Sequence, residues 1–450
     1  MSAIARYFLS RGFNVSGYDK VESELTQSLA TEGAEIHYSE DVALIPKKVA
    51  FVVYTPAVPQ DHEELVYYRS NDYIVVKRSD VLQAITAGTF NICIAGTHGK
   101  TTTTSLISHI LRHSGYGCTA FLGGVAVNYN TNFWSTNANV CVVEADEYDR
   151  SFLKLSPDVA VITAMDADHL DIYGNEKTMQ DAFIEFGNRI KSEGLLVSKF
   201  GVTRIKEINT KRKICYSLQN DAADVFACNI KIEDGGYRFD IQLNEQTISG
   251  LELRVGGMHN VENAVAAIAV AHQLEIDPEK IKAAVSDFKG VHRRFEYIIP
   301  PEKKEPGGLV EPVLIDDYAH HPEELRSLLN SVRSLFPQRI VTVIFQPHLY
   351  TRTRDLAEGF AEVLSIPDRL ILLPIYPARE EPIEGVSSEM ILKDAEAEQK
   401  HMMTKDELLK WLQHHATEMN KEFGEVIVMA GAGDIDRLVE PVKQILLGEN

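Results

Sequence analysis

A short loop with two glycines, a lysine and a threonine has the residue types that bind nucleotide phosphates. The loop GTHGKT (residues 96–101) follows an apolar strand pattern at residues 90–95 and precedes a helical pattern. Glycines let backbone N–H groups approach phosphate oxygens, a lysine offsets charge between the β- and γ-phosphates, and a threonine hydroxyl can bind Mg²⁺. The longer GxxxxGK[ST] pattern is not met, because Ile94 stands at its first glycine. We predict phosphate binding here, with a tight turn and a surface lysine as the alternative.

Acidic residues follow the next two predicted strands. Glu144 comes directly after the apolar run 140–143, and Asp166, Asp168 and His169 come after the run 159–163. The carboxyl ends of parallel strands meet at the edge where α/β sheets bind ligands, and carboxylate oxygens suit Mg²⁺. We therefore predict Mg²⁺ binding by Glu144, with a solvated acidic loop as the alternative. His169 is a candidate ligand of a second divalent ion, with a polar loop as the alternative, and no other His or Cys stands at zinc spacing.

Two further segments have residues that suit a nucleotide. Asn260 lies where the predicted helix 264–274 opens, and its amide could bind a base edge or cap the helix. Arg294 lies in RRFE (residues 293–296), at a predicted domain boundary. An arginine there could stabilise charge on a γ-phosphate, or it could form an interdomain salt bridge.

Polar residues also follow two strands in the last third of the chain. The motif DDYAHHP (residues 316–322) ends one strand, and FQPHLYTR (residues 345–352) ends the next. Arg352 could hold a small carboxylate through a bidentate pair. A structural role is the alternative for any one histidine in these motifs.

The alternation of strand and helix patterns predicts an α/β protein with largely parallel sheets. We expect three domains, at residues 1–88, 89–293 and 294–450. The first resembles a Rossmann-like unit, with a helix near residues 4–9 and strands at 13–18 and 49–54. The usual first strand and glycine-rich turn of such a unit have no counterpart in the sequence, so we expect this domain to lack both.

The other two domains have their own patterns. In the second domain, alternating residues around a DGG turn (residues 234–236) predict a β-hairpin insertion within residues 215–256. The third reads as a doubly wound α/β domain, with strands at 313–315, 340–345, 370–373 and 426–429 and a capping box at Thr404 and Glu407.

Composition narrows the class of protein. The formal net charge of −20 argues against a nucleic-acid partner, because phosphate backbones bind basic faces. The sequence has neither the apolar length of a membrane span nor the pattern of a signal peptide, so we expect a cytoplasmic protein without membrane insertion. Five cysteines without a CxxC pair predict no disulfide framework, and Cys93 and Cys141 read as buried apolar residues.

Seven motifs in one order resemble the UDP-N-acetylmuramate–L-alanine ligases of the Mur ligase superfamily. They are GTHGKTTT, EADEYDRSF, DADHLDIYG, GMHNVENA, GVHRRFE, DDYAHHP and FQPHLYTRTRD, and they span almost the whole chain. The resemblance implies UDP-sugar recognition in the first domain, an ATPase centre in the second, and ATP and amino-acid binding in the third. It also implies peptidoglycan precursor synthesis: ATP activates the substrate carboxylate as an acyl phosphate, and the alanine amine then attacks.

The resemblance assigns roles to residues. Catalytic roles fall to Lys100, Glu144, His169 and His348, with His348 receiving the amine proton. ATP would meet Gly96, Thr97, Gly99, Lys100, Thr101, Thr102, Asn260 (adenine), Arg294 (phosphates) and Asp317 (ribose region). Alanine would meet Tyr318, His348 and Arg352, the UDP-sugar would meet Ser2, Thr55 and Ala57, and Mg²⁺ would bind Thr101, Glu144 and His169. We expect a monomer or a homodimer.

The chain departs from the family pattern at Leu349, where some relatives have an arginine. Three rival interpretations are open. The recycling ligase that attaches a preformed tripeptide to the same UDP-sugar is similar through the phosphate loop, although DRSF (residues 149–152) favours the alanine enzyme. A nucleotide-dependent switch or kinase, or a binding protein without turnover, would form no amide product.

Overall fold

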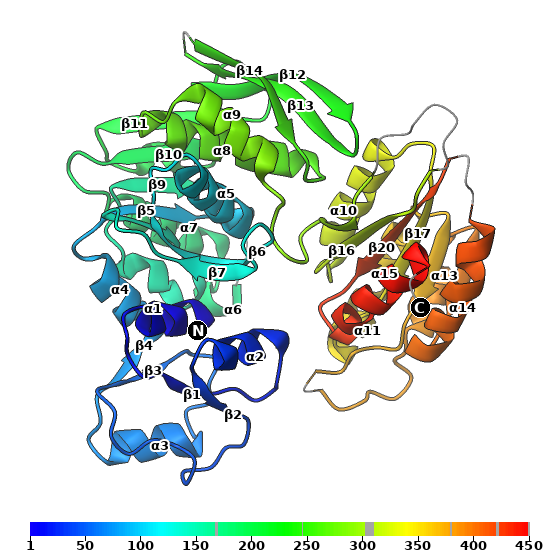
Figure 1. Ribbon diagram of the computed structural model, residues 1–450, viewed down its shortest axis with the longest axis horizontal. Helices are drawn as coiled ribbons and strands as arrows, with labels where there is room; N and C mark the ends of the chain where they lie inside the picture. Colours follow the sequence, from blue (N-terminus) through cyan, green and yellow to red (C-terminus); the bar gives the residue numbers. More distant parts are fainter. Residues whose placement is uncertain (167–169, 245, 302–309, 379, 420–422, 449–450) are drawn as a thin grey trace. The chain divides into compact units, whose positions relative to one another are not determined.

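The structure is a computed structural model that describes residues 1–166, 170–244, 246–301, 310–378, 380–419 and 423–448 (Figure 1). The predicted ligand His169 and most of the proline- and glycine-rich segment 300–308 lie outside these residues. The chain divides into two compact units. The first comprises Met1–Cys228, Ile241–Ile248 and Glu262–Val285, and the second comprises Asn229–Asp240, Ser249–Val261 and Ser286–Asn450.

The first 88 residues alternate short strands with helices. The elements are α1 (Ser2–Ser10), β1 (Ser16–Tyr18), α2 (Glu24–Thr31), β2 (Glu35–His37), β3 (Val52–Tyr54), α3 (Glu63–Ser70), β4 (Val75–Lys77) and α4 (Arg78–Thr86). They form two separate parallel pairs, β1–β2 and β3–β4. The strand predicted from Phe13 begins only at Ser16, because the Phe13 N–H bonds the Phe8 carbonyl and closes α1 instead. The strand predicted from Val49 likewise begins only at Val52.

A ten-stranded sheet places the phosphate loop. Its order is β14-β13-β12-β11-β10-β9-β5-β8-β6-β7. Strand β5 (Phe90–Ala95) pairs in parallel with β8 (Val140–Glu144) and β9 (Val159–Ile162). The carboxyl ends of these three strands therefore meet at one edge of the sheet, and helix α5 (Lys100–His113) starts directly after the loop.

The remaining elements of this part complete the sheet and its covering helices. They are β6 (Thr119–Ala126), β7 (Thr131–Trp134), η1 (Tyr148–Lys154), α6 (Leu170–Tyr173), α7 (Glu176–Gly187), β10 (Leu195–Lys199), η2 (Ile205–Glu207), β11 (Arg212–Ser217), β12 (Val225–Glu233), β13 (Gly236–Leu243), β14 (Gln246–Leu253), α8 (Met258–Gln273) and α9 (Pro278–Asp287). The predicted hairpin turn is confirmed between β12 and β13. Tyr237, Phe239 and Ile241 are buried, as the alternating pattern requires.

A six-stranded sheet lies at the centre of the second unit, in the order β15-β16-β20-β17-β18-β19. All neighbours are parallel except β15 and β16. The elements are β15 (Glu296–Ile299), β16 (Val313–Asp317), α10 (Pro322–Leu335), β17 (Ile340–Phe345), α11 (Tyr350–Asp355), α12 (Ala357–Val363), β18 (Arg369–Leu372), α13 (Glu389–Asp394), β19 (Gln399–Met402), α14 (Lys405–Glu418), β20 (Glu425–Ala430), η3 (Asp434–Leu438) and α15 (Val439–Leu447). Four of these strands confirm the sequence prediction, whereas β15 and β19 were not predicted. The capping box of Thr404 and Glu407 is confirmed at the start of α14.

The apolar strand runs form the buried centre of each sheet. Residues 92–95 of β5 are fully buried, and so are residues 426–430 of β20. Cys93 and Cys141 lie in the first core, and burial raises the thiol pKa of both well above the ordinary value. Both are therefore inert apolar residues, as predicted. None of the helices in the described ranges has the length and apolar character that crossing a membrane requires.

Candidate active site

The phosphate loop is held in a shape that only glycine accepts at two positions. Gly96 has φ of +138° and Gly99 has φ of +77°. A Cβ atom on Gly96 would lie 2.0 Å from the Thr163 hydroxyl oxygen and 2.8 Å from the backbone nitrogen of Ala164. The Thr163 hydroxyl donates a hydrogen bond of 2.5 Å to the His98 carbonyl, which fixes the loop against the end of β9. The loop therefore leaves its backbone groups free of side chains, as phosphate binding needs.

Lys100 reaches across the loop to a buried carboxylate. Its Nζ donates to the Gly96 carbonyl at 2.6 Å and to Glu147 Oε1 at 2.7 Å. The Glu147 side chain is fully buried, and the backbone carbonyl of Glu147 accepts a hydrogen bond of 2.6 Å from Tyr173. Glu147 was not among the predicted residues, although it lies only three positions after Glu144. This buried carboxylate fixes the position of the Lys100 ammonium group beside the loop.

Thr101 and Glu144 form the predicted pair of oxygen ligands. The Thr101 hydroxyl donates to Glu144 Oε1 at 2.9 Å, and the Gly123 N–H donates to Oε2 at 3.0 Å. A Cβ atom at position 123 would lie 2.2 Å from that carboxylate oxygen, so β6 can approach Glu144 only because Gly123 is a glycine. A hydroxyl and a carboxylate side by side at the start of α5 are hard oxygen donors, and this arrangement fits Mg²⁺.

The segment after β9 also reaches the phosphate loop. The backbone N–H of Asp166 donates to the Thr97 hydroxyl at 3.2 Å, and the Thr97 N–H donates to the Ala164 carbonyl at 3.2 Å. The predicted second metal ligand, His169, follows three residues later but lies outside the described part of the chain.

Helix α8 presents two asparagines at a spacing of three residues. Asn260 is buried, and its amide donates to the Gly256 carbonyl at 2.7 Å. Asn263, which was not predicted, accepts a hydrogen bond of 3.2 Å from the Thr103 hydroxyl. A Cβ atom on Gly99 would lie 2.5 Å from Asn263 Oδ1. Asn263 therefore lies against the phosphate loop. The second Asn of the motif GMHNVENA is the feature of the sequence that could have identified it.

The two arginines of the RRFE segment have different surroundings. The Arg293 guanidinium lies 3.3 Å from Asp316, donates to the Gly431 carbonyl at 2.5 Å, and lies 5.1 Å from the centre of the Tyr318 ring. Arg294, the predicted phosphate ligand, is exposed. Arg293 forms its ion pair with Asp316 within the second unit, so this pair is not the interdomain salt bridge considered for the motif.

The carboxyl end of β16 carries two acidic residues with raised pKa values. Burial raises the pKa of Asp316 to about 7, although the Arg293 charge opposes the shift. Burial likewise raises the pKa of Asp317 to about 6, opposed by hydrogen bonds from the backbone N–H groups of Phe295 and Ala319, each of 2.7 Å. Asp317 therefore joins the residue just before β15 to the segment just after β16.

The residues predicted to bind the substrate alanine lie in one cluster of the second unit. Arg352 donates to His348 Nδ1 at 3.2 Å, and the His348 and His320 ring centres are 6.1 Å apart. The Tyr318 and His320 rings meet edge to face at 5.1 Å. Burial, with Arg352 and His320 next, lowers the pKa of His348 to about 4. The structure thus brings Tyr318, His348 and Arg352 together and adds His320, which the sequence offered only as part of DDYAHHP.

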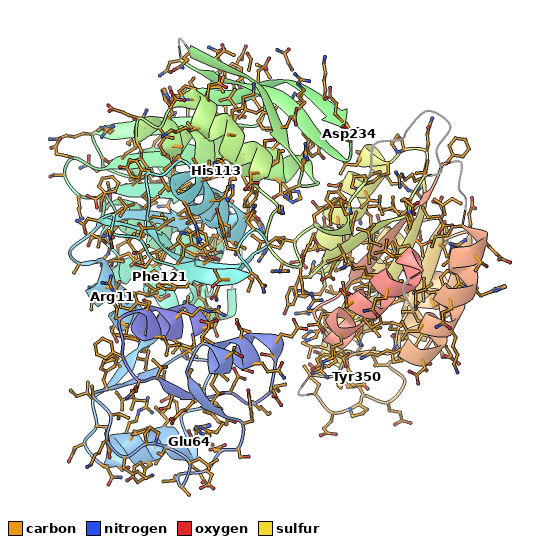
Figure 2. All side chains as sticks on the ribbon, in the orientation of Figure 1. Arg11, Glu64, His113, Phe121, Asp234 and Tyr350 are labelled. Atoms are coloured by element: carbon orange, nitrogen blue, oxygen red, sulfur yellow. The ribbon has the colours of Figure 1, made fainter. Side chains whose placement is uncertain are left out.

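A backbone outlier precedes the helix that carries Arg352. Leu349 has φ of +71°, a conformation that a leucine rarely adopts. Its N–H donates to the Tyr376 carbonyl at 3.0 Å, and the Thr351 N–H donates to Glu380 at 3.0 Å. These contacts hold α11, whose first residue Tyr350 is labelled in Figure 2, in the orientation that directs Arg352 toward His348. Strain of this kind is concentrated at functional sites.

The residues predicted to bind the UDP-sugar lie in two places of the first unit. Ser2 is the first residue of α1, and its hydroxyl accepts a hydrogen bond of 2.8 Å from the Asn132 amide. Thr55 and Ala57 lie in the loop that follows β3.

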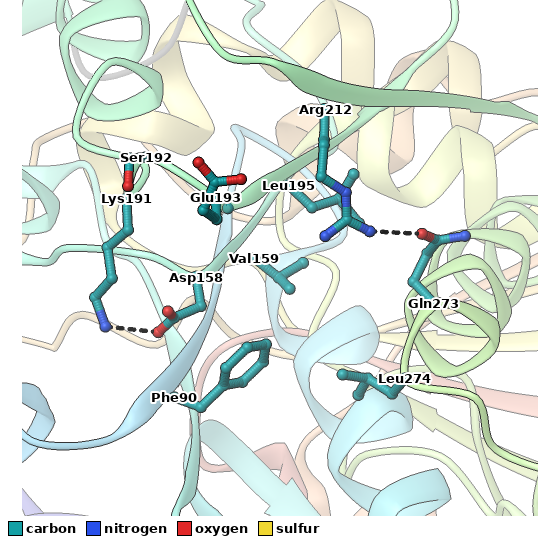
Figure 3. Close-up of a pocket in the computed structure, with 11 residues that line it drawn as sticks. Phe90, Asp158, Val159, Lys191, Ser192, Glu193, Leu195, Arg212, Gln273 and Leu274 are labelled. Carbon is teal, nitrogen blue, oxygen red and sulfur yellow. Dashed lines mark hydrogen bonds and ion pairs between the residues drawn. The ribbon is translucent and has the colours of Figure 1, made fainter.

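A pocket of about 360 Å³ lies in the first unit, near the amino ends of β5, β9, β10 and β11 (Figure 3). Four of its polar side chains form two pairs: Lys191 contacts Asp158 at 2.7 Å, and Arg212 donates to Gln273 at 3.2 Å. None of the predicted site residues lines this pocket.

Three family models match the chain in sequence order. The Mur ligase family catalytic domain matches residues 1–89, the Mur ligase middle domain matches residues 94–271, and the Mur ligase glutamate ligase domain matches residues 293–433. The predicted class, an α/β protein of three domains, is confirmed, and the bounds 1–88, 89–293 and 294–450 stay predictions.

Named relatives are similar over almost the full length. The UDP-N-acetylmuramate–L-alanine ligase of Porphyromonas gingivalis is 46% identical over 99% of this chain and 96% of that protein. The protein of the same name from Parabacteroides distasonis is 47% identical over 99% of this chain and 95% of that one.

Two solved structures are similar to this chain over almost its full length. The UDP-N-acetylmuramate–alanine ligase of Thermotoga maritima is 26% identical, with a TM-score of 0.82 over 100% of this chain and 97% of that one. A murein peptide ligase of Psychrobacter arcticus shares the fold, with a TM-score of 0.68 at 21% identity over 99% and 96% of the two chains. The chain therefore belongs to the Mur ligase family.

Proposed function

We propose that the chain joins L-alanine to UDP-N-acetylmuramate in an ATP-dependent reaction of peptidoglycan precursor synthesis. The name shared by relatives 46% and 47% identical over 99% of the chain supports this function. The observation that carries the chemistry is the arrangement at the end of β5, where Lys100, Thr101 and Glu144 meet at one glycine loop. That arrangement suits the transfer of a phosphoryl group to a carboxylate oxygen.

The reaction needs two steps at one carboxyl group, the first at the γ-phosphorus of ATP and the second at the carboxyl carbon. A carboxylate oxygen of the muramate attacks the γ-phosphorus of ATP, which gives an acyl phosphate and ADP. The alanine amine then attacks the acyl carbon, loses a proton, and expels inorganic phosphate as the amide forms. Lys100 offsets the negative charge that gathers between the phosphates, and the loop N–H groups hold the transferred oxygens.

Thr101 and Glu144 are the proposed ligands of Mg²⁺, and His169 is the proposed ligand of a second ion. When bound, Mg²⁺ supplies a Lewis acid that neutralises phosphate charge. Lys100, Glu147 and the loop backbone orient the nucleotide beside it. Gly96, Thr97, Gly99 and Thr102 would contribute to the same phosphate site.

Arg352 is the proposed partner of the alanine carboxylate. Its hydrogen bond occupies His348 Nδ1, so a neutral His348 carries its proton on Nε2. When Arg352 turns to the substrate carboxylate, Nδ1 becomes available to receive the amine proton. His320 is a second candidate for this step, because its Nδ1 donates to the Tyr318 carbonyl at 2.9 Å and Nε2 is then the basic nitrogen.

The other assignments are proposals of the same kind. Asn260 would meet adenine, Arg294 the phosphates, Asp317 the ribose region, and Ser2, Thr55 and Ala57 the UDP-sugar. Tyr318 would complete the alanine pocket. We propose a cytoplasmic monomer or homodimer, with neither nucleic acid nor membrane insertion as part of its function.

The test is phosphate release from Mg²⁺-ATP with UDP-N-acetylmuramate, with and without L-alanine, and with the product checked by mass. We expect alanine-dependent release and the matching amide. A parallel assay with L-Ala-γ-D-Glu-meso-diaminopimelate separates the recycling ligase, which would prefer that acceptor. If phosphate release were the same with and without either acceptor, this would exclude a ligase and favour a switch or kinase.

A Lys100→Ala variant tests the role of the phosphate loop in the same assay. We expect turnover to fall at least about 100-fold, the scale for losing a preorganised charge-stabilising group. Lys154→Ala is the matched control, because Lys154 pairs with Asp80 outside the loop. Near-wild-type phosphate release by the Lys100 variant would contradict the proposed chemistry.

A further inference from the structure

A chain of polar side chains leads from Glu32, just after α2, to the first residue of α1. The Arg6 guanidinium binds Glu32 at 2.7 to 3.0 Å and donates to Asn132 Oδ1 at 2.7 Å. The Asn132 amide nitrogen then donates to the Ser2 hydroxyl at 2.8 Å. Arg6, Asn132 and Ser2 are 5%, 7% and 8% exposed. Groups so deeply buried are stable only when their hydrogen bonds are satisfied, so this chain has one preferred arrangement.

The direction of each hydrogen bond follows from the chemistry of its partners. A guanidinium can only donate, so the oxygen of Asn132 must face Arg6 and the NH₂ group must face Ser2. The Ser2 oxygen accepts this bond, and its own proton therefore points elsewhere. Among the described residues, the Ser2 hydroxyl donates no hydrogen bond. Asn132 thus presents the Ser2 hydroxyl as a free donor at the start of α1.

Packing holds α1 against the strand that carries Asn132. The Tyr7 ring lies 5.7 Å from that of Phe121 on β6, which is labelled in Figure 2, and 6.1 Å from that of Phe133 on β7. Asn132 lies beside Phe133 on β7. Because the aromatic contacts and the polar chain join the same two elements, the position of the Ser2 hydroxyl is set by β7 as well as by α1.

We infer that Asn132 is a positioning residue for the UDP-sugar, because it directs the Ser2 hydroxyl proton toward the substrate. The inference rests on the proposed function, in which Ser2 binds the UDP-sugar. Arg6 holds the Asn132 side chain in place, and Asn132 acts on the substrate through the Ser2 hydroxyl. A bond from a hydroxyl to an anionic substrate is worth more than a neutral one, so misdirecting its proton should weaken substrate binding.

An Asn132→Asp variant separates positioning from a purely structural role. The aspartate still accepts from Arg6, so the buried guanidinium keeps its partner and the melting temperature should stay within about 3 °C of wild type. The carboxylate cannot donate to Ser2, so the Ser2 hydroxyl must donate to it instead. We expect the KM for UDP-N-acetylmuramate to rise about tenfold or more, with kcat and the KM values for ATP and alanine within about threefold.

Two further variants complete the experiment. Ser2→Ala should raise the same KM by a similar factor, and the double variant should show no additional rise, because both changes remove one donor. Asn137→Asp, at an exposed position shortly after β7, is the control for added charge and should leave all three KM values unchanged.

Three results would overturn the inference: a wild-type KM in either single variant, equal rises for all three substrates, or effects of the two changes that simply add. If Asn132→Asp fails to fold, Ser2→Ala alone still decides, because a wild-type KM in that variant leaves Asn132 nothing to position. Absence of turnover in the wild-type protein would instead contradict the proposed function, so the two failures are distinguishable.

Discussion

Arg352, on α11, lies four positions after His348, and the two side chains share a hydrogen bond of 3.2 Å. If the guanidinium holds the alanine carboxylate, Arg352→Ala should raise the KM for alanine about tenfold or more, and that for ATP much less, since a charged hydrogen bond is lost from one substrate only. Arg354→Ala is the matched control, because Arg354 lies on the same helix and pairs with Asp355 at 2.7 Å. Equal effects of Arg352→Ala on both KM values would remove Arg352 from the alanine pocket.

The low pKa of His348 has a consequence for stability. Burial and the nearby Arg352 lower this pKa from 6.5 to about 4. Between these two values the unfolded chain binds more protons than the folded chain, so His348 contributes stability at neutral pH that is lost as the pH falls from about 6.5 toward 4.

A His348→Gln variant tests this contribution to stability. We expect its melting temperature to fall less than that of wild type between about pH 7.5 and about pH 5, because the unfavourable protonation is removed. His414→Gln is the control, since the His414 side chain is 79% exposed, and it should follow the wild type. Identical pH profiles for the two variants would show that His348 is not the group responsible.

At the scale of elements, the phosphate loop depends on how closely it approaches β9. Gly96→Ala places a methyl group 2.0 Å from the Thr163 hydroxyl oxygen, whereas a methyl group at Gly115, which also has a positive φ, would extend into open space. We expect Gly115→Ala to cost about 1 kcal/mol of unfolding free energy, the ordinary strain of a left-handed alanine.

The clash at Gly96 adds to that strain. We expect Gly96→Ala to cost about 2 kcal/mol or more and also to lower turnover, because the loop must move away from Thr163. Urea unfolding and the phosphate-release assay measure the two effects. Similar losses for the two variants would mean that the close approach, and hence the loop shape, does not matter.

At the scale of the whole molecule, each compact unit has its own core. Phe183 lies in the core of the first unit, Leu412 in that of the second, and both are fully buried. Chains with two cores need not unfold in one step, so we expect calorimetry to resolve two transitions.

Substitutions in the cores assign these transitions. Phe183→Ala and Leu412→Ala should each cost about 2 to 5 kcal/mol and lower the temperature of a different transition. A single transition that both variants lower equally would show that the two cores unfold together.

Several features were predictable because the signals for them lie in contiguous residues. Strand β5 and strand β17 have the predicted bounds, and the glycine loop follows β5 directly. The hairpin turn at residues 234–236 was predictable for the same reason, since turn residues and alternation are local signals. Strand β19 (QKHM) was missed because it is short and polar and pairs only at the sheet edge.

Side-chain partnerships were harder to predict, because they join residues far apart in the chain. Glu147 could be suspected as part of an acidic cluster, but only the fold shows that it binds Lys100, 47 positions away. Arg293 rather than Arg294 forms the salt bridge with Asp316 in the second unit, a choice that adjacent identical residues cannot reveal.

The order of the domains, the phosphate loop and the family resemblance could be predicted from the sequence, because each depends on residue types at short spacing. Three contacts became evident only from the folded chain: Asn263 lies against Gly99, His320 lies beside His348, and Asn132 faces Ser2. Residues 132 and 2 are 130 positions apart, and no local pattern encodes which backbone will approach which. Packing of α1 on β7 brings them together, and burial then requires that their hydrogen bonds be satisfied.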